Sequence, residues 1–284
     1  MKKPITVKVL VTVNDLAHLA ACTLAFKSLR VGWPTAKIYI YVNGGDYYGD
    51  IADKLQREAK LPVDIYATKP VHHAEWIRGC VYTSTPGPLV IVDADTVFWR
   101  SCEDWEFNED IVLAGYFVPR MWNDFAKAVS EPRIHTSLMV FPDVARLYQA
   151  IRQAYPLAYK AHGDYCPCEP FYPHVSFVDG EPRFWDSCAN LYGMLASLER
   201  SPVLQRILHF GPEHKACYDH LNSASFYDVM RERLEGGTRE GFIAAHRDWV
   251  KNPTPGLWPL VDAYYEQKAI EGWIKCPGDR TLKV

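Results

Sequence analysis

Short runs of apolar, often β-branched residues alternate with amphipathic stretches through the first half of the chain. Residues 6–13 read TVKVLVTV, which is typical of a buried strand, and similar runs predict strands at 37–42, 63–67 and 89–92. Between these runs, apolar residues at helical spacing predict helices that end near Pro34, over about 51–60 and over about 73–82. Strands separated by single helices pair in parallel through right-handed crossovers. The pattern therefore predicts an α/β fold with helices on both faces of a mostly parallel central sheet.

The second half of the chain has a less regular pattern. Its apolar runs predict strands at 111–118, 137–141 and 204–209, helices at 144–154 and about 185–199, and two or three C-terminal helices. Residues 155–182 are rich in Pro, Tyr, His and Cys and predict a long irregular segment, which inside a compact domain is usually a functional loop. We expect a main domain over residues 1–216 and a helical extension over residues 217–284 in the same globule.

The composition is that of an ordinary globular protein. The chain has 284 residues, 48% of them hydrophobic and 23% charged, and its 31 Lys and Arg against 34 Asp and Glu leave a formal net charge of −3. These values exclude a collagen, a disordered chain and a membrane protein with many spans, and the charge opposes general nucleic-acid binding. The apolar run near the N-terminus carries Lys8 and lacks a cleavage site, and eight cysteines are too sparse for a disulfide framework. We therefore expect reduced thiols and a cytoplasmic location.

The strongest chemical signal is a pair of carboxylates directly after the apolar run at 89–92, at Asp93 and Asp95. In an open parallel sheet, ligands bind at the carboxyl ends of the strands. Two carboxylates one residue apart at such an end are suited to a hard divalent cation, Mn²⁺ or Mg²⁺, which would neutralise a diphosphate. The alternative is a strand followed by a solvated acidic turn.

Four segments of the chain resemble the GT-A glycosyltransferases, in particular the glycogenin and galactosyltransferase-like group. They are the end of the first strand (Val11-Thr12-Val13-Asn14), the acidic segment IVDADTV from Ile91, the strand HTSLMVF from His135, and the segment HFGPEHK from His209. The resemblance covers roughly residues 6–215 and implies a GT-A, Rossmann-like fold. It implies an enzyme that moves a sugar from a nucleoside diphosphate sugar, with a UDP-sugar as the expected donor, to an acceptor hydroxyl with retention of anomeric configuration. The acceptor class is open among glycans, proteins, lipids and small molecules, and a modified DNA base fits the net charge less well.

The resemblance also implies roles at the metal and the diphosphate. Asp93 and Asp95, separated by Ala94, correspond to the metal motif of the family, and His209 to its third metal ligand. Lys215 corresponds to the lysine that holds the diphosphate, where it would stabilise the charge of the leaving group. The plainer alternatives are a core histidine and a surface lysine.

Further residues are implied at the donor. Val11, Thr12 and Asn14 would contact the nucleotide, and Arg78 would approach the donor phosphates or sugar. Asp186 corresponds to an acidic residue near the reacting sugar. It also stands at a predicted helix start, so an N-cap is the structural alternative. For Arg78 the alternative is a solvated helix face.

Three other classes of protein are compatible with the acidic pair. The segment from Asp93 to Val97 fits the nucleophile motif of HAD-like phosphatases, although that motif normally lies on the first strand. A nucleotidyltransferase also uses paired Asp but usually carries a glycine-rich loop after the first strand. A nucleotide-sugar binding module without catalysis is the third.

Two weaker features complete the set. Arg133 and His135 flank a predicted strand and are candidates for contact with the acceptor. A cluster of thiol and imidazole ligands has the right number for zinc, although its spacing matches no common finger: His162, Cys166, Cys168 and His174. Its alternative is an irregular loop with free thiols.

Overall fold

The structure is a computed structural model that describes residues 4–11, 25–43, 48–67, 71–98, 100–123, 126–161, 170–178, 180–199 and 205–220. The chain falls into two compact units. Unit 1 comprises Met1–Lys8, Val71–Val92 and Trp105–Gly211, and unit 2 comprises Val9–Pro70, Asp93–Asp104 and Pro212–Val284. The predicted boundary between residues 1–216 and 217–284 stays a prediction, because most of the second part lies outside the described residues.

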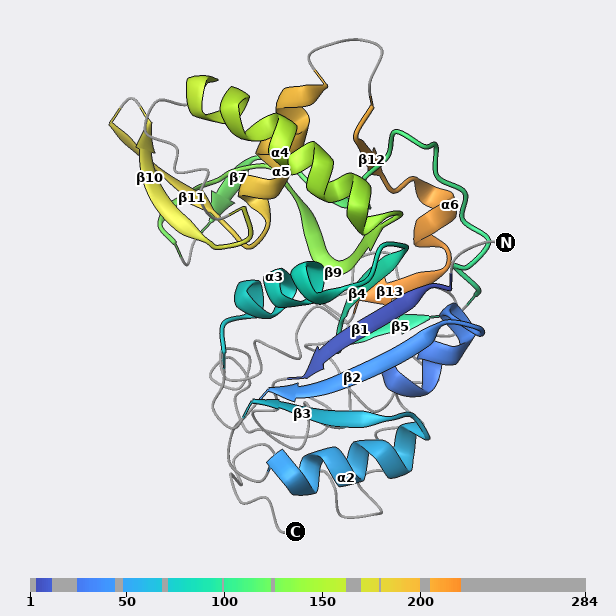
Figure 1. Ribbon diagram of the computed structural model, residues 1–284. Coiled ribbons are helices and arrows are strands. Elements are labelled where there is room, and N and C mark those ends of the chain that lie inside the picture. Colours follow the sequence, from blue (N-terminus) through green and yellow to red (C-terminus); the bar gives the residue numbers. More distant parts are fainter. Residues whose placement is uncertain are drawn as a thin grey trace. The chain divides into compact units, whose positions relative to one another are not determined.

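Seven strands form the large sheet of the fold: β1 (Thr6–Val11), β2 (Lys37–Asn43), β3 (Val63–Ala67), β4 (Leu89–Asp93), β6 (Leu113–Val118), β9 (Arg133–Phe141) and β12 (Ile207–His209). Their order is β12-β6-β9-β4-β1-β2-β3. β2 and β3 lie side by side in Figure 1. β12 is parallel to β6 and β2 to β3, whereas β9 runs antiparallel to both β6 and β4. Because β6 and β4 are both antiparallel to β9, these two strands share one direction with β12, and β9 is opposed to both of its neighbours. The predicted α/β fold with a mostly parallel sheet is thus confirmed.

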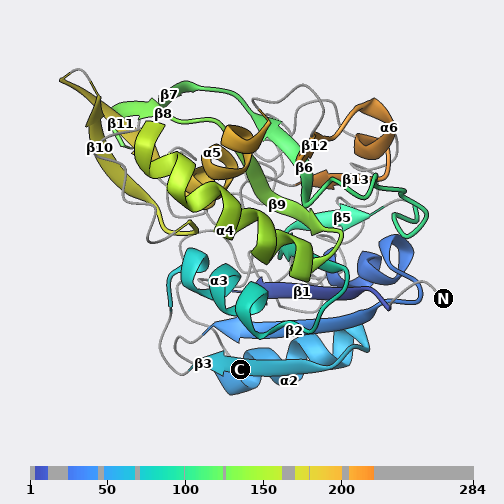
Figure 2. The same ribbon diagram turned by 45° about the horizontal axis from the view of Figure 1, so that its top comes forward.

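Three helices belong to unit 1: α3 (His73–Thr83), α4 (Val144–Ala161) and α5 (Ala189–Leu198). α5 packs on β9 and β12, and α4 packs in turn on α5, beside which it lies in Figure 2. α3 buries one face, which includes Trp76 and Ile77, and its backbone is tied to α4 by the Tyr148 hydroxyl, which donates to the Val81 carbonyl at 2.5 Å. None of the helices among the described residues combines the length and the apolar run that crossing a bilayer requires.

Unit 1 also carries a second, smaller sheet of four strands: β7 (Met121–Asn123), β8 (Ala128–Ser130), β10 (His174–Val178) and β11 (Glu181–Trp185). Their order is β10-β11-β8-β7. The prediction that residues 155–182 are irregular is therefore wrong in part, since α4 extends to Ala161 and β10 pairs antiparallel with β11 across Gly180. The helix predicted from about residue 185 begins at Ala189, because Trp185 is paired with His174 in this sheet.

Unit 2 contains α2 (Tyr48–Ala59), which packs on β2 and β3, and the short helix α6 (Pro212–Lys215). It also contains a two-stranded antiparallel sheet of β5 (Thr96–Phe98) and β13 (Tyr218–His220). Phe98 anchors this sheet: its buried ring lies 6.2 Å from the ring of Trp33 and 6.2 Å from the ring of Tyr218. A Cβ added at Gly32 would lie 2.5 Å from Phe98, so the close approach requires glycine there.

Candidate metal and nucleotide site

Asp93 and Asp95 stand where a fully buried strand ends. The four residues of β4 before Asp93 are at most 1% exposed, as expected for a strand covered on both faces. Asp93 ends β4, Ala94 and Asp95 form a turn, and β5 begins at Thr96. The side chain of Asp93 is 19% exposed and that of Asp95 is 6% exposed. The end of the apolar run thus presents two carboxylates with little access to water.

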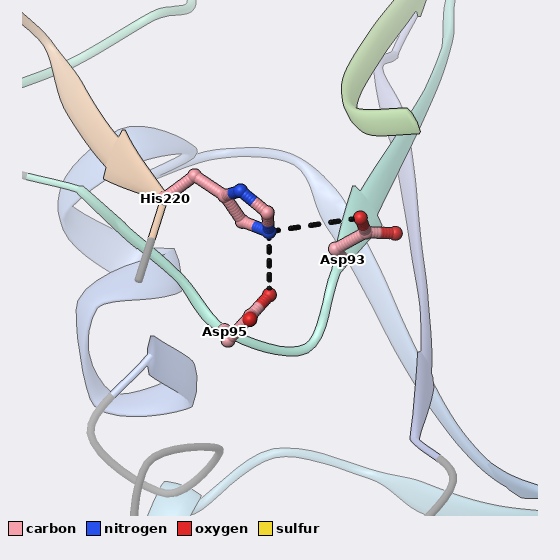
Figure 3. A group of neighbouring side chains, drawn as sticks. All are labelled: Asp93, Asp95 and His220. Carbon is pink, nitrogen blue, oxygen red and sulfur yellow. Dashed lines mark ion pairs between the residues drawn. The ribbon is translucent and has the colours of Figure 1, made fainter. Parts of the chain in front are cut away.

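A histidine joins these carboxylates from the far end of the described chain. Residues directly opposite each other in an antiparallel pair have neighbouring side chains, and β13 places His220 opposite Thr96, next to Asp95. His220 Nε2 lies 2.9 Å from Asp95 Oδ1 and 3.8 Å from Asp93 Oδ2 (Figure 3). The three side chains form a group whose ligand atoms all lie within 4.8 Å of one another.

The position of His220 depends on contacts along β13. Tyr218 is opposite Phe98 in the register, and the rings of both residues are buried. The Arg100 amide donates a hydrogen bond to the Cys217 carbonyl at 3.4 Å, which continues the pairing beyond the strands. The packing of Tyr218 at one end of the three-residue strand β13 therefore positions the imidazole of His220 at the other end.

The electrostatics of the group favour a cation between the carboxylates. Burial alone lowers the pKa of His220, but the charge of Asp95, its hydrogen bond and the charge of Asp93 outweigh burial and raise the pKa above its ordinary value. A proton on His220 offsets one of the two negative charges. A divalent cation would offset both.

The donor atoms fit such a cation. Carboxylate oxygens suit Mg²⁺ and Mn²⁺, and imidazole suits the softer first-row ions, so the mixed set is well matched to Mn²⁺. The ligand atoms of the three side chains lie within 4.8 Å of one another. Two ligands on opposite sides of an ion, with bonds of about 2.1 Å, are about 4 Å apart, so the group is close to the size that a bound ion requires. Among the described residues, His209 is not a member of this group.

His209, the predicted third ligand, lies at the end of β12 in unit 1. Its ring stacks on Phe117 with centroids 4.3 Å apart, and its Nε2 is 3.3 Å from the Tyr192 hydroxyl. Burial lowers its pKa, which favours the neutral imidazole. Its role as a ligand stays a prediction. His220 was not singled out from the sequence, because a three-residue strand is too short to leave a periodic signal.

The predicted diphosphate and nucleotide residues are only partly described. Lys215 ends α6 and is exposed, five residues before His220 in the chain. Val11 is the buried last residue of β1, whereas Thr12 and Asn14 lie outside the described residues. Arg78 is exposed on α3, with its guanidinium carbon 5.4 Å from the centroid of the Tyr82 ring.

Asp186 lies between β11 and α5 and is held by two polar contacts. Its Oδ2 is 2.7 Å from Arg133 Nη2, and its Oδ1 accepts a hydrogen bond from the Ser187 amide at 2.7 Å. The N-cap of α5 is Cys188, which has a left-handed backbone (φ 65°), so Asp186 is not the cap residue that its position suggested. The predicted catalytic role of Asp186 stays a prediction, and Arg133 is its partner.

Only one residue of the candidate zinc cluster, His174, lies among the described residues. His174 stacks on Trp185 with centroids 5.7 Å apart and lies 3.2 Å from Asn190 Nδ2. Burial lowers its pKa. The other three candidate ligands (His162, Cys166 and Cys168) lie outside the described residues. Four other cysteines are buried: Cys80, Cys102, Cys188 and Cys217.

Comparison with known proteins finds similarity in structure but not in sequence. No family model and no curated protein matches the sequence. The chain is similar to a mannosyltransferase from Pyrobaculum calidifontis in complex with GDP-Man and Mn²⁺, at 13% identity over 95% of this chain and 76% of that one, with a TM-score of 0.44. It is similar to the galactosyltransferase LgtC in complex with donor and acceptor sugar analogues, at 11% identity over 72% and 73% of the two chains, with a TM-score of 0.39.

A third similar structure is the glycosyltransferase GlyE of Streptococcus pneumoniae, at 13% identity over 74% of this chain, with a TM-score of 0.37. The chain spans 46% of the length of that protein. The three similar structures are glycosyltransferases. Because these TM-scores are all below 0.5, the function of this chain is inferred from its own residues.

Proposed function

We propose that the chain is a glycosyltransferase that moves a sugar from a nucleoside diphosphate sugar to an acceptor hydroxyl. The observation that carries the proposal is the convergence of Asp93, Asp95 and His220 at the carboxyl end of a buried strand of the sheet. Ligand sites in open α/β sheets lie at such strand ends. The four sequence segments that resemble GT-A enzymes include the first two of these residues.

The three side chains would hold Mn²⁺ or Mg²⁺. When bound, such an ion acts as a Lewis acid that stabilises the charge developing on the leaving diphosphate. Asp93 and Asp95 supply two negative charges in a place with little water, and His220 must release its proton to ligate. In this proposal His220, rather than His209, is the third ligand.

Two other residues have roles in the proposal. Lys215 is an exposed cation only five residues from His220 and would add positive charge near the diphosphate. Asp186, held by Arg133, would orient or stabilise the reacting sugar. A UDP-sugar donor and retention of configuration are the finer parts of the proposal, and both follow from the sequence resemblance.

Thermal unfolding with nucleoside diphosphates tests the proposal. UDP, GDP and ADP, and UDP-glucose, UDP-galactose and GDP-mannose, are each added with and without Mn²⁺. A nucleotide at about 100 times its dissociation constant adds about 2.7 kcal/mol to the free energy of unfolding, which raises the midpoint by about 5 to 10 °C. We expect this rise only with Mn²⁺ and with one nucleotide class.

Two histidine variants separate the candidate ligands. His220→Ala should abolish the Mn²⁺-dependent rise, whereas His209→Ala should keep it. Release of free sugar from the donor in the absence of acceptor distinguishes the enzyme from a binding module. Release of inorganic phosphate from sugar phosphates, or formation of a nucleotide sugar from a sugar 1-phosphate and a nucleoside triphosphate, would contradict the proposal in favour of a phosphatase or a nucleotidyltransferase.

A further inference from the structure

Cys102 and Cys217 lie just beyond the paired residues of β5 and β13. Cys102 follows the end of β5, and Cys217 directly precedes β13. Both contact the backbone of Arg100: its amide donates a hydrogen bond to the Cys217 carbonyl at 3.4 Å, and its carbonyl oxygen lies 3.8 Å from Cys102 Sγ. All of these segments belong to unit 2. Two cysteines that are far apart in the sequence are thus neighbours in the fold.

The side chains of the two cysteines are buried and point toward each other. Cys102 is 2% exposed and Cys217 is 8% exposed. Burial raises the pKa of the Cys102 thiol, and the Cys217 thiol raises it further through its charge and a hydrogen bond between the two side chains. A disulfide forms without movement of the backbone only where the two side chains already point at each other, and a hydrogen bond between the thiols requires that orientation.

We propose that Cys102 and Cys217 are a disulfide-forming pair, and that the bond fixes β13 on β5 with His220 beside Asp95. Cys217 adjoins a strand of only three residues that ends at His220, so a covalent link at Cys217 opposes separation of β13 from β5. The two cysteines are roughly a hundred residues apart, and a disulfide that closes so long a loop also restricts the unfolded chain strongly. The proposal does not depend on the proposed activity.

The oxidant in this proposal is a low-molecular-weight disulfide, such as oxidised glutathione. The thiolate of Cys217, the more exposed of the two residues, attacks one glutathione sulfur, the glutathione S–S bond breaks and one glutathione thiolate leaves. Cys102 then loses its proton and attacks the Cys217 sulfur of the mixed disulfide, which releases the second glutathione. Two protein thiols are oxidised, one glutathione disulfide is reduced to two thiols, and the two protons pass to the released thiolates. Because both thiols are buried, the first attack requires local opening of β13, and we expect a slow reaction.

Peptide mapping tests the pair directly. Native protein is incubated with an excess of oxidised glutathione, alkylated in urea and digested without reduction. We expect a peptide that joins Cys102 to Cys217 and that dithiothreitol separates. Cys80 and Cys188 are also buried and serve as internal controls, which we expect to recover as alkylated thiols. Absence of the Cys102–Cys217 link after prolonged incubation would overturn the proposal, and so would links from these two residues to Cys80 or Cys188 in equal yield.

Hydrogen exchange tests the effect on the strand. The amides of residues 218–220 should exchange at least about 10-fold more slowly in oxidised than in reduced wild type, and the midpoint of thermal unfolding should rise by about 5 °C or more. Cys102→Ala should show neither change on oxidation, whereas Cys80→Ala, the control at another buried cysteine, should show both. The comparison of oxidised with reduced wild type needs no substitution, so it decides the question even where a variant folds poorly. Equal exchange of these amides in the linked and the reduced protein would refute the fixing of His220.

Discussion

Neutralising Asp95 should weaken binding of the metal without unfolding the protein. Asp95 is the more buried of the two carboxylates, and its Oδ1 lies 2.9 Å from His220 Nε2. Asp95→Asn keeps an amide oxygen that can accept the same hydrogen bond, so the local structure should survive. The change removes one of the two negative charges that would bind the cation.

The loss of Mn²⁺ affinity can be estimated from the 2.9 Å distance between Asp95 Oδ1 and His220 Nε2. Two unit charges 2.9 Å apart attract by about 6 kcal/mol at an effective dielectric constant of about 20. Desolvation cancels most of this, and hydrogen bonds to charged groups contribute about 1.5–3 kcal/mol net. We take that smaller range as the minimum loss for a divalent ion. It corresponds to a dissociation constant for Mn²⁺ that rises by about 10- to 150-fold.

Isothermal titration of Mn²⁺ into wild type and Asp95→Asn, each with and without the nucleotide that gave the largest thermal shift, measures the loss. Asp104→Asn is the matched control, since Asp104 is an exposed acid nine residues later in the same unit. Circular dichroism verifies that both variants fold. Equal Mn²⁺ affinity in wild type and Asp95→Asn would refute the assignment of the metal site.

Three further predictions concern titration, packing and thiol reactivity. In metal-free protein, the raised pKa of His220 implies stabilisation that is fully present below pH 6.5 and is lost as the pH rises through that raised pKa. Urea titrations at a series of pH values should therefore show the free energy of unfolding falling over this range in wild type and not in His220→Gln. Gly115→Ala places a Cβ against Ile134 Cγ2 and should lower the free energy of unfolding by about 3 kcal/mol. Gly49→Ala in α2, whose added Cβ meets no atom within 4 Å, should raise the free energy of unfolding by up to about 1 kcal/mol. Burial raises the pKa of Cys80 to about 12, so mass spectrometry should find it alkylated by iodoacetamide at pH 8 in urea but not in the native protein.

Elements with a strong local signal are found where the sequence predicts them. β3 covers residues 63–67, as predicted from its apolar run, and α3 begins at His73, as the helical spacing indicates. The β10–β11 hairpin was missed because its segment is rich in residues typical of loops, and because its apolar positions, such as Phe177, face outward rather than into a core. A rule that assigns apolar alternation to buried faces cannot predict that arrangement.

The site was predictable only in the part that is local in sequence. Asp93 and Asp95 follow directly on a buried run, and the end of that run is visible in the sequence. His220 reaches them through the pairing of two three-residue strands, and that register depends on the packing of Phe98 against Tyr218. Such a long-range contact has no counterpart in the spacing of residues along the chain.

The pairing of β5 with β13 would make the proposed metal site a late event in folding. It joins segments from distant parts of the chain, and closing so long a loop costs entropy that only the finished contacts repay. A nascent chain that has emerged only as far as Lys215 would have both carboxylates but would lack His220. Under the proposed function, acquisition of the cation would then report that synthesis and folding have passed His220, and an incompletely made chain would bind the proposed cation poorly.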